Sequence, residues 1–460
     1  MTALDKIRST RAPHHLAHEL TETLGLAVPM ALTQLSQIAM MATDLAFIGR
    51  LGNEAVAAAA LAGTVYFVSF TIGMGLVSAV APLAAQAFGA RDPRQVRRAL
   101  RTGLWAALLI SLPIMPFSLY GEPILLALGQ APTAARLAQH YLFGLVWGVT
   151  PALWFMAIRG FMGAVNRPQP ALWITLAAIP ANALLVYPLI YGEWGFPRLE
   201  LFGAGLATTT VNFGTVLASL WFATSRPPFR KYRVLGRVWR IDWRLMRQLV
   251  AIGAPISLSF MMEYGLFSAA ALLMGLISTT ALAAHQVALQ VTAILFMVPY
   301  GISMAATVRV GHAVGRNDPG AVKRAGLVAI LLGIVLVAGF TLAVIAGRFA
   351  IARFFFGMAE EASVTVELAA NLLLVGSTFF IADGIQSIAA GSLRGMNDTR
   401  VPLLFAAISY WLIGFTLACL LGFRTGLGAI GVWIGLSVGT AIYALLLTLR
   451  FRRLASRLAA

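Results

Sequence analysis

Long apolar stretches separated by short polar segments run along almost the whole chain. Each stretch is long enough, at roughly 20 residues or more, for a helix to cross a hydrocarbon layer about 30 Å thick. A β-barrel would instead show short segments of alternating polarity. The pattern therefore predicts an all-α polytopic membrane protein with twelve spans, at 24–48, 60–86, 99–119, 137–158, 171–191, 201–223, 248–274, 283–311, 323–346, 363–391, 401–422 and 427–449.

Composition supports a membrane protein. The 460 residues are 59% hydrophobic and 11% charged, whereas about 25% of residues are charged in soluble domains. The polar segment 1–23 lacks the apolar region of a secretory signal, so we expect it to remain in the mature protein. The single cysteine, Cys419, excludes an internal disulfide.

The positive charge follows the predicted topology. The net charge is +17, but most of the 34 Lys and Arg residues fall in alternate links between spans. This bias places both termini in the cytosol, and it explains the charge without a nucleic-acid partner. The longest polar segment, "RPPFRKYRVLGRVWRIDWRLMRQ" (226–248), is either an interfacial helix against anionic lipid headgroups or a solvated linker. Membrane lipids are therefore expected partners.

An internal repeat divides the chain into two halves. "AFGARDPRQVRRAL" (87–100) recurs as "AVGRNDPGAVKRAG" (313–326), and about 75 surrounding residues align without a gap at an offset of 226. A second, shorter repeat pairs "GFMGAVNRP" (160–168) with "GSLRGMNDT" (391–399). Because each half holds six spans, the halves enter the membrane in the same direction. We expect two six-helix lobes related by a pseudo-two-fold axis along the membrane normal, with a cleft between them.

These observations predict five parts in a protein that we expect to be a monomer. They are a cytosolic N-terminal segment (1–23), an N-lobe (24–225), a basic cytosolic linker (226–247), a C-lobe (248–450) and a cytosolic tail (451–460).

Three acids lie inside apolar spans: Asp44, Glu263 and Asp383. A carboxylate at the bilayer centre costs about 2.5–3.5 kcal/mol on insertion scales, so such residues are functional candidates. None has an acid at the corresponding position of the other half. Glu263 and Asp383 should lie ~20 Å and ~15 Å from the inner ends of their spans, and Asp44 nearer the outer side.

The predicted surroundings of these acids suggest cation exchange. No Lys or Arg lies at a matching depth in their spans, so the sequence predicts no salt bridge for them. A proton, a metal cation or a cationic ligand would then have to neutralise each carboxylate. Competition between two such cations is a physical basis for exchange, and the membrane potential adds about 2.3 kcal/mol per charge per 100 mV to inward cation flow.

The chain resembles the multidrug and toxic compound extrusion transporters, in particular their NorM-like branch, over almost its whole length. The matching segments are "TDLAFIGRLG" (43–52), "SAVAPLAAQAFGA" (78–90), "FMMEYGLFSAAALLMG" (260–275), "LAAHQVAL" (282–289) and "AAGSLRGMNDT" (389–399). The resemblance implies two six-helix lobes around a V-shaped cleft. It also implies export of organic, mostly cationic, lipophilic compounds in exchange for Na⁺ or H⁺, with no cofactor besides this coupling ion.

The resemblance also implies roles for individual residues. Asp44 corresponds to the helix-one acid of the first lobe, and Glu263 and Asp383 to the acids of the second lobe's cation site, which would bind Na⁺ if sodium is coupled. In some relatives the first-lobe site also uses a fifth-helix acid and a sixth-helix threonine. Asn182 stands in place of that acid here, whereas Thr208 matches the threonine.

Other residues are weaker candidates. Met261, Met262, Phe267 and Phe379 are candidates to line a substrate cavity, since methionine offers soft, adaptable surface. They are equally compatible with a lipid-facing position. Some relatives have a tyrosine at the position of Phe379, so this chain has one oxygen ligand fewer there. His285, alone in its span, is interpreted as a packed hydrogen-bonding residue.

Two other transporter classes and an enzyme remain as alternatives. A major-facilitator transporter also has two six-helix halves, but its second-to-third loop has a different glycine and arginine spacing. A lipid-linked oligosaccharide flippase would carry basic residues in its cavity, whereas the acids here favour cations. The chain shows no nucleophile–base set or metal-ligand cluster, so we expect no enzymatic activity.

Overall fold

The computed structural model describes residues 3–460, and side chains from residue 15 onward. Part of the predicted segment 1–23, including the side chain of His14, therefore lies outside the described residues. The described chain is helical and contains no strand. It divides into two compact units: Leu32–Leu258, called the first lobe below, and Ser259–Ala460 together with the chain up to Ala31, called the second lobe.

Two helices, α1 (Ala3–Gly49) and α10 (Trp243–Ile277), each belong partly to both units. The other elements of the first lobe are α2 (Asn53–Val77), α3 (Val80–Gly89), α4 (Pro93–Leu119), α5 (Gly121–Ala127), α6 (Pro132–Val146), α7 (Val149–Ala164), α8 (Gln169–Tyr191), α9 (Leu201–Ser225) and the 3₁₀ turn η1 (Phe229–Tyr232). Those of the second lobe are α11 (Thr279–Gly315), α12 (Pro319–Phe356), η2 (Glu360–Ala362), α13 (Ser363–Gly395), α14 (Arg400–Ala406), the π-helical η3 (Ala407–Phe415), α15 (Thr416–Phe423) and α16 (Ala429–Ala459).

The helices confirm the predicted all-α membrane fold. Within the described residues, eleven helical segments are long and apolar enough to cross a membrane. The pair α6 and α7, bent by 48° at its break, provides a twelfth span if it crosses as one unit. The domain bounds expected from the sequence remain predictions.

The repeated Asp-Pro phrase forms the same helix start twice. Asp92 caps α4 by accepting a hydrogen bond from the backbone of Gln95, and Asp318 caps α12 in the same way. A side-chain oxygen at this position satisfies a backbone N–H that the helix leaves free, and proline suits the next residue because it needs no donor. The residues just before, Arg91 and Asn317, turn the chain with positive φ angles of 57° and 55°.

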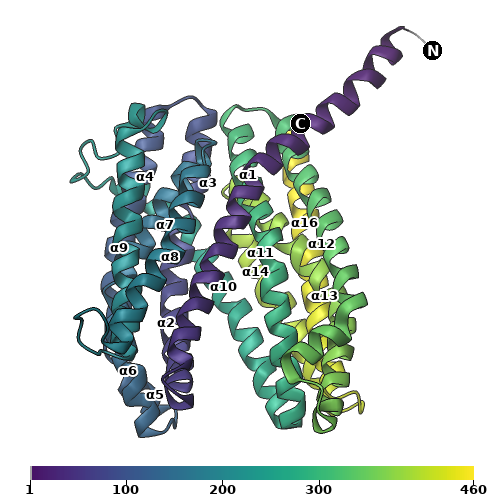
Figure 1. Cartoon of the computed structure of the whole chain (residues 1–460). Helices are drawn as coiled ribbons and strands as arrows, with labels where there is room; N and C mark the ends of the chain where they lie inside the picture. The colour runs from purple at the N-terminus through teal and green to yellow at the C-terminus, as the bar shows by residue number, and fades with distance from the viewer. Residues whose placement is uncertain (1–2) are drawn as a thin grey trace. The chain divides into compact units, whose positions relative to one another are not determined.

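Close backbone contact joins α6 and α9 in the first lobe (Figure 1). A Cβ on Gly144 would meet the backbone of Gly205 at 2.9 Å, which leaves room only for glycine. Small residues let helix backbones approach closely inside a bilayer. The Thr209 hydroxyl donates to the carbonyl of Gly144 at 2.6 Å, so the rotation of α9 against α6 is well defined.

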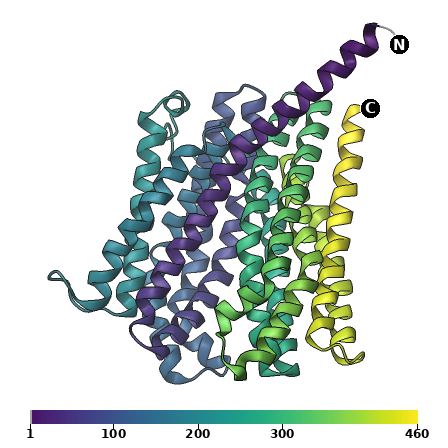
Figure 2. The ribbon, with the colours of Figure 1, turned by 45° about the vertical axis from the view of Figure 1, so that its right-hand side comes forward.

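In the second lobe, α13 packs against α11, α12 and α16 (Figure 2). The hydroxyl of Ser303 on α11 donates to the carbonyl of Ser387 at 2.7 Å, and that of Thr307 donates to the carbonyl of Gly391 at 2.8 Å. A side chain on Gly391 would collide with the backbone of Ser303. These contacts set the rotation of α13, which carries Asp383.

Candidate functional site

Three predicted residues of the first lobe come together although they are distant in sequence. Asp44 on α1 is only 7% exposed. Its Oδ1 accepts a hydrogen bond from Nδ2 of Asn182 on α8 at 2.5 Å, and its Oδ2 accepts one from the hydroxyl of Thr208 on α9 at 3.2 Å. Two helices of the lobe, α8 and α9, therefore place neutral polar groups beside one buried carboxylate on α1.

The amide of Asn182 has an oxygen left over. This side chain is fully buried, and its Oδ1 has no hydrogen-bond partner among the described residues. A buried acceptor without a partner is unfavourable and calls for an explanation such as an ion. The Asp44 carboxylate, Asn182 Oδ1 and the Thr208 hydroxyl are the hard oxygen ligands that metal cations such as Na⁺ prefer.

The two acids of the second lobe also lie near each other. Glu263 on α10 is half-buried, and Asp383 on α13 is 4% exposed. Their carboxyl groups are close enough to interact electrostatically. Oδ1 of Asp383 accepts a hydrogen bond at 2.9 Å from Nε2 of Gln386, one turn further along α13. Two carboxyl groups that repel each other when both are ionised form a site at which a bound cation is favoured.

Tyr410 stands beside this acidic pair. It interacts electrostatically with both Glu263 and Asp383, and its buried hydroxyl has no hydrogen-bond partner in the described part of the chain. It belongs to the π-helical segment η3, and π-helical turns occur frequently at functional sites. Its ring lies 4.9 Å from that of Tyr443 on α16. The hydroxyl of Tyr410 is therefore a candidate oxygen for the second-lobe site, whereas Phe379 has none.

A basic residue of α13 acts on one member of the acidic pair, Glu263. Arg394 lies near the end of α13, with its guanidinium 5.1 Å from the ring centre of Phe260 on α10. It interacts electrostatically with Glu263, one turn beyond Phe260. None of the salt bridges within 4.0 Å among the described residues includes Glu263 or Asp383. Arg394 is therefore a nearby charge and not an ion-pair partner of Glu263.

The candidate cavity residues have different surroundings. Phe379 is 1% exposed and packs against Phe267 and Trp433, at ring distances of 5.9 and 5.5 Å. Met262 lies partly buried against the same core, whereas Met261 is 37% exposed. Of these candidates, Met261 is the most accessible, and Phe379 is a core residue of this structure.

His285 is completely buried beside the same aromatic cluster. Its Nδ1 accepts a hydrogen bond from Nε1 of Trp433 at 3.0 Å, which agrees with its interpretation as a packed hydrogen-bonding residue. Its Nε2 has no partner among the described residues.

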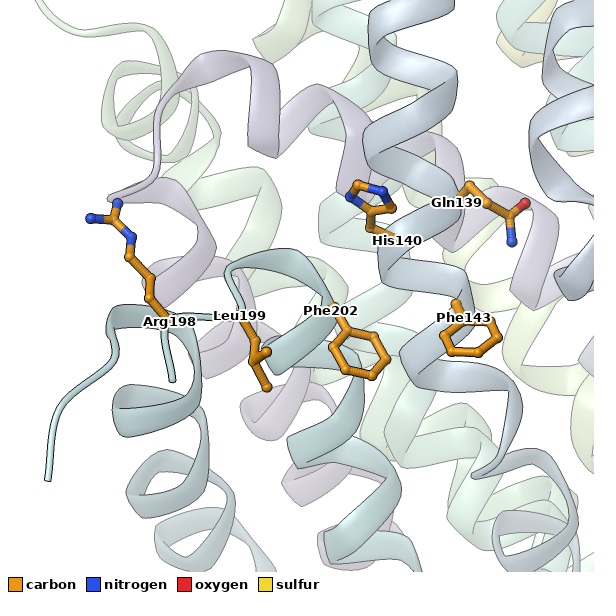
Figure 3. Close-up of a pocket in the computed structure, with 6 residues that line it drawn as sticks. All are labelled: Gln139, His140, Phe143, Arg198, Leu199 and Phe202. Carbon is orange, nitrogen blue, oxygen red and sulfur yellow. The ribbon is translucent and has the colours of Figure 1, made fainter. Parts of the chain in front are cut away.

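A pocket of about 470 Å³ opens elsewhere on the first lobe, between α6 and the loop before α9 (Figure 3). Its lining residues are Gln139, His140, Phe143, Arg198, Leu199 and Phe202. Gln139 is already engaged, because its Oε1 accepts from the backbone of Glu122 and its Nε2 donates to the carbonyl of Ser118. The pocket contains no acid, so it is not a candidate cation site.

Within the part of the chain that the structure describes, no group of three or more His, Cys, Asp or Glu side chains is arranged to hold a metal. A cation at either candidate site would therefore be held by at most two carboxylates together with neutral oxygens. Such a donor set suits an ion that must bind and leave, since fewer charged ligands hold a cation less tightly.

Comparison with a protein-family model identifies the family. The MatE model matches residues 29–188 and 255–420, so the two matches begin at Pro29 and Pro255, which correspond in the internal repeat. The chain belongs to the MatE family. Asp44 and Asn182 lie in the first matched region, and Glu263 and Asp383 in the second.

Curated members of the MatE family cover the whole chain. A probable multidrug resistance protein NorM of Bradyrhizobium diazoefficiens is 67% identical over 464 residues, which is 100% of both chains. One from Rhodopseudomonas palustris is 60% identical, covering 95% of this chain and 92% of its own. The multidrug resistance protein NorM of Burkholderia vietnamiensis is 37% identical over 98% of both. Their names describe multidrug resistance proteins.

Solved structures show the same fold. The eukaryotic MATE transporter AtDTX14 matches with a TM-score of 0.86 at 21% identity, covering 96% of this chain and 98% of that one. A transporter of the MOP superfamily from Pyrococcus furiosus, described as having a binding pocket of reversed polarity, matches with a TM-score of 0.87 at 20% identity, covering 96% and 97%. The MatE fold thus applies to nearly the entire chain.

Sequence reasoning missed Gln386, Arg394, Tyr410 and Tyr443. Gln386 had a local signal, because it follows Asp383 by three residues and so shares its helix face. The two tyrosines are polar residues inside apolar spans, but nothing local distinguishes them from residues at the membrane interface. The proximity of Arg394 to Glu263 depends on how α10 and α13 pack.

Proposed function

We propose that this protein is a secondary active antiporter that exports organic, mostly cationic, lipophilic compounds in exchange for Na⁺ or H⁺. The proposal rests on the position of Asp44, Glu263 and Asp383 inside spans and on their lack of a salt bridge in the described part of the chain. All three lie in spans, and no salt bridge within 4.0 Å among the described residues includes any of them. The names of the curated relatives support drug export.

An unpaired carboxylate in a span must be neutralised, because leaving it charged and alone costs several kcal/mol. A coupling cation and a cationic substrate both meet this need. When they compete for the same carboxylates, binding of one favours release of the other. A ligand shifts a conformational equilibrium only by its difference in affinity for the two states. The carboxylates provide this difference in affinity, because a bound cation stabilises a carboxylate more in a closed site than in a site open to water.

The first-lobe site has the donor set that suits Na⁺ best. The Asp44 carboxylate, the unpartnered Oδ1 of Asn182 and the Thr208 hydroxyl are hard oxygen ligands on three helices. The second-lobe pair of Glu263 and Asp383 suits either a proton or Na⁺, because either relieves the repulsion between the two carboxyl groups.

We further propose that the protein lies in the bacterial inner membrane as a monomer with both termini in the cytosol. The distribution of Lys and Arg between links supports this orientation. Fusion of a reporter that is active only in the cytosol to the C-terminus tests it. An active reporter is expected, and an inactive one together with an active periplasmic reporter would reverse the topology.

Reconstitution into vesicles tests the transport function. Ethidium efflux is followed under a Na⁺ gradient alone and under a pH gradient alone. Efflux should follow one or both gradients and should fall strongly in Glu263→Gln and Asp383→Asn. Glu367→Gln is the control, because Glu367 is exposed on the same helix as Asp383. If both variants export ethidium at the wild-type rate, the proposed mechanism is wrong.

The earlier alternatives are less well supported. Membership of the MatE family argues against a major-facilitator transporter. A flippase for anionic lipid-linked sugars would need positive charge at its sites, whereas both candidate sites centre on carboxylates. Saturable binding of an anionic lipid-linked sugar, combined with no ethidium efflux, would favour the flippase.

A further inference from the structure

The segment between α9 and α10 is docked firmly on the first lobe. It contains only the 3₁₀ turn η1 and further turns, so it is not the continuous interfacial helix that its composition allowed. Phe229 and Tyr232 are buried, and their rings lie 5.9 and 5.5 Å from that of Phe161 on α7. The indole of Trp105 on α4 donates to the carbonyl of Val238 at 2.6 Å. The linker therefore has a defined position against α4 and α7.

An arginine cluster lies where this linker meets α4. Arg101 is only 7% exposed, and its guanidinium donates to the carbonyl of Arg237 at 3.4 Å. Its Nε and the buried Nε of Arg97, one turn earlier, have no hydrogen-bond partner among the residues that the structure describes. The positive charges of Arg97, Arg98 and Arg240 all act on Arg101.

One acid offsets these four arginines. Asp242 pairs with Arg98 and accepts a hydrogen bond from the backbone of Leu245 at 3.2 Å. Burial alone would raise the pKa of Asp242, but the hydrogen bond from Arg98 and the positive charges of Arg98 and Arg101 hold it below its ordinary value. Asp242 is thus ionised and forms a salt bridge with Arg98. The positive charges of Arg97, Arg101 and Arg240 therefore remain in excess.

The second copy of the repeat is neutralised differently. Arg324, which corresponds to Arg98, lies 3.9 Å from Glu19 on α1. Arg309 pairs with the same glutamate and lies 3.6 Å from Glu22. Here two acids face two arginines. The paired arginines of the second copy thus have as many acids as arginines, whereas four arginines of the first copy lie around Asp242.

The cluster lies at the depth of lipid headgroups. Arg97 and Arg101 belong to the first turns of α4, roughly 6 and 12 Å from its start. Trp239 and Trp243 beside them are 71% and 61% exposed. Exposed tryptophans are typical of the boundary between lipid and water. A lipid phosphate would contact guanidinium groups here, and the glycerol and upper acyl chains of the same lipid would contact indole rings.

We propose that Arg97, Arg101 and Arg240 bind the phosphate of an anionic phospholipid, with Trp239 and Trp243 contacting the adjoining glycerol and upper acyl chains. Guanidinium groups bind phosphate through paired, charge-assisted hydrogen bonds. Free phosphate shares this chemistry, but the exposed tryptophans favour a lipid. The site is independent of the proposed transport function.

Native mass spectrometry of the full-length protein in detergent tests the site. Phosphatidylglycerol, phosphatidylcholine and inorganic phosphate are added separately, and bound adducts are counted against concentration. Phosphatidylglycerol should bind about tenfold more tightly than phosphatidylcholine, and inorganic phosphate should bind much more weakly.

Variants identify the residues that carry the binding. Arg97→Gln and Arg240→Gln should each weaken phosphatidylglycerol binding about tenfold, the loss of roughly one charge-assisted hydrogen bond. Lys323→Gln is the matched control, because Lys323 corresponds to Arg97 in the second copy and should leave binding unchanged. Arg240 is exposed, so its variant keeps the test valid if a more buried substitution impairs folding.

Three results would overturn the proposal. Equal binding of both lipids would show that charge recognition is absent. An equal effect of Lys323→Gln and Arg97→Gln would show that any basic residue of this surface suffices. Phosphate binding as tight as that of phosphatidylglycerol would assign the site to a free anion.

Discussion

Replacement of Asp44 by asparagine separates a cation site from a structural contact. Asparagine has the same shape as aspartate, so Oδ1 at position 44 can still accept from Asn182 Nδ2, which lies 2.5 Å away. Asparagine can also still accept or donate near Thr208. The substitution therefore removes the charge and leaves the packing of α1, α8 and α9 in place.

Two effects on stability nearly cancel. Removing a lone buried carboxylate relieves up to about 2.5–3.5 kcal/mol. The two hydrogen bonds to the carboxylate fall from about 1.5–3 kcal/mol each to about 0.5–1.5 kcal/mol each when the acceptor is neutral, which costs about 2–3 kcal/mol together. The net change in the free energy of unfolding should lie within about 1 kcal/mol. Loss of one charged ligand should nevertheless weaken cation binding about 10- to 100-fold.

Two measurements on the same preparation check this expectation. Thermal unfolding of Asp44→Asn should shift by only a few degrees. The Na⁺ or H⁺ concentration for half-maximal ethidium efflux from vesicles should rise about 10- to 100-fold. Glu54→Gln is the control, since Glu54 is an exposed acid on α2 of the same lobe. A variant that unfolds much more easily but keeps the wild-type cation dependence would show that Asp44 is structural, and would refute the reasoning.

Three further results are expected. Arg394→Gln should change the cation concentration for half-maximal efflux several-fold, because its charge acts on Glu263, and Arg394→Lys should restore it; equal effects of the two variants would indicate a packing role. Gly391→Ala should lower the free energy of unfolding by about 1–3 kcal/mol, because the added methyl group forces α11 away from α13. Gly339→Ala is the control and should be neutral or stabilising, since Gly339 has open space around it. Equal Tm values for the two variants would contradict this prediction. Because the pKa of Asp242 is held below its ordinary value of 3.8, its pair with Arg98 stabilises the protein at neutral pH and is lost as pH falls below about 4. Asp242→Asn should therefore lower Tm at pH 7 by an amount that shrinks as the pH falls below 3.8, and a constant difference would exclude this ion pair as the cause.

Local chemistry explains why part of the molecule could be predicted. Apolar length identifies a span whatever surrounds it, because the bilayer requires every backbone group to be bonded within its own helix. Asp-Pro at 92–93 and 318–319 predicts a helix start because the cap is formed by adjacent residues. The three acids were recognisable for a similar reason, since a charge in an apolar run is costly in any tertiary arrangement.

The composition of the linker was less informative. Its mixture of Arg and Trp suits an interfacial helix, a solvated loop or a docked segment equally well. Only the ring contacts of Phe229 and Tyr232 with Phe161, and the bond from Trp105 to Val238, decide among these. The same contacts place Arg240 beside Arg101, which no local pattern could indicate.

By itself, the sequence determined the class of protein, the spans, the duplication and the acids that lie inside spans. These depend on hydrophobicity and on hydrogen bonds between neighbouring residues. The tertiary structure decided what surrounds each acid: Asn182 and Thr208 around Asp44, and Tyr410 near Glu263. Such neighbours depend on the rotation of each helix about its axis. That rotation is set by close contacts of glycines and small hydroxyl residues on many helices. Because these contacts act together, no sequence pattern at any one position predicts the rotation.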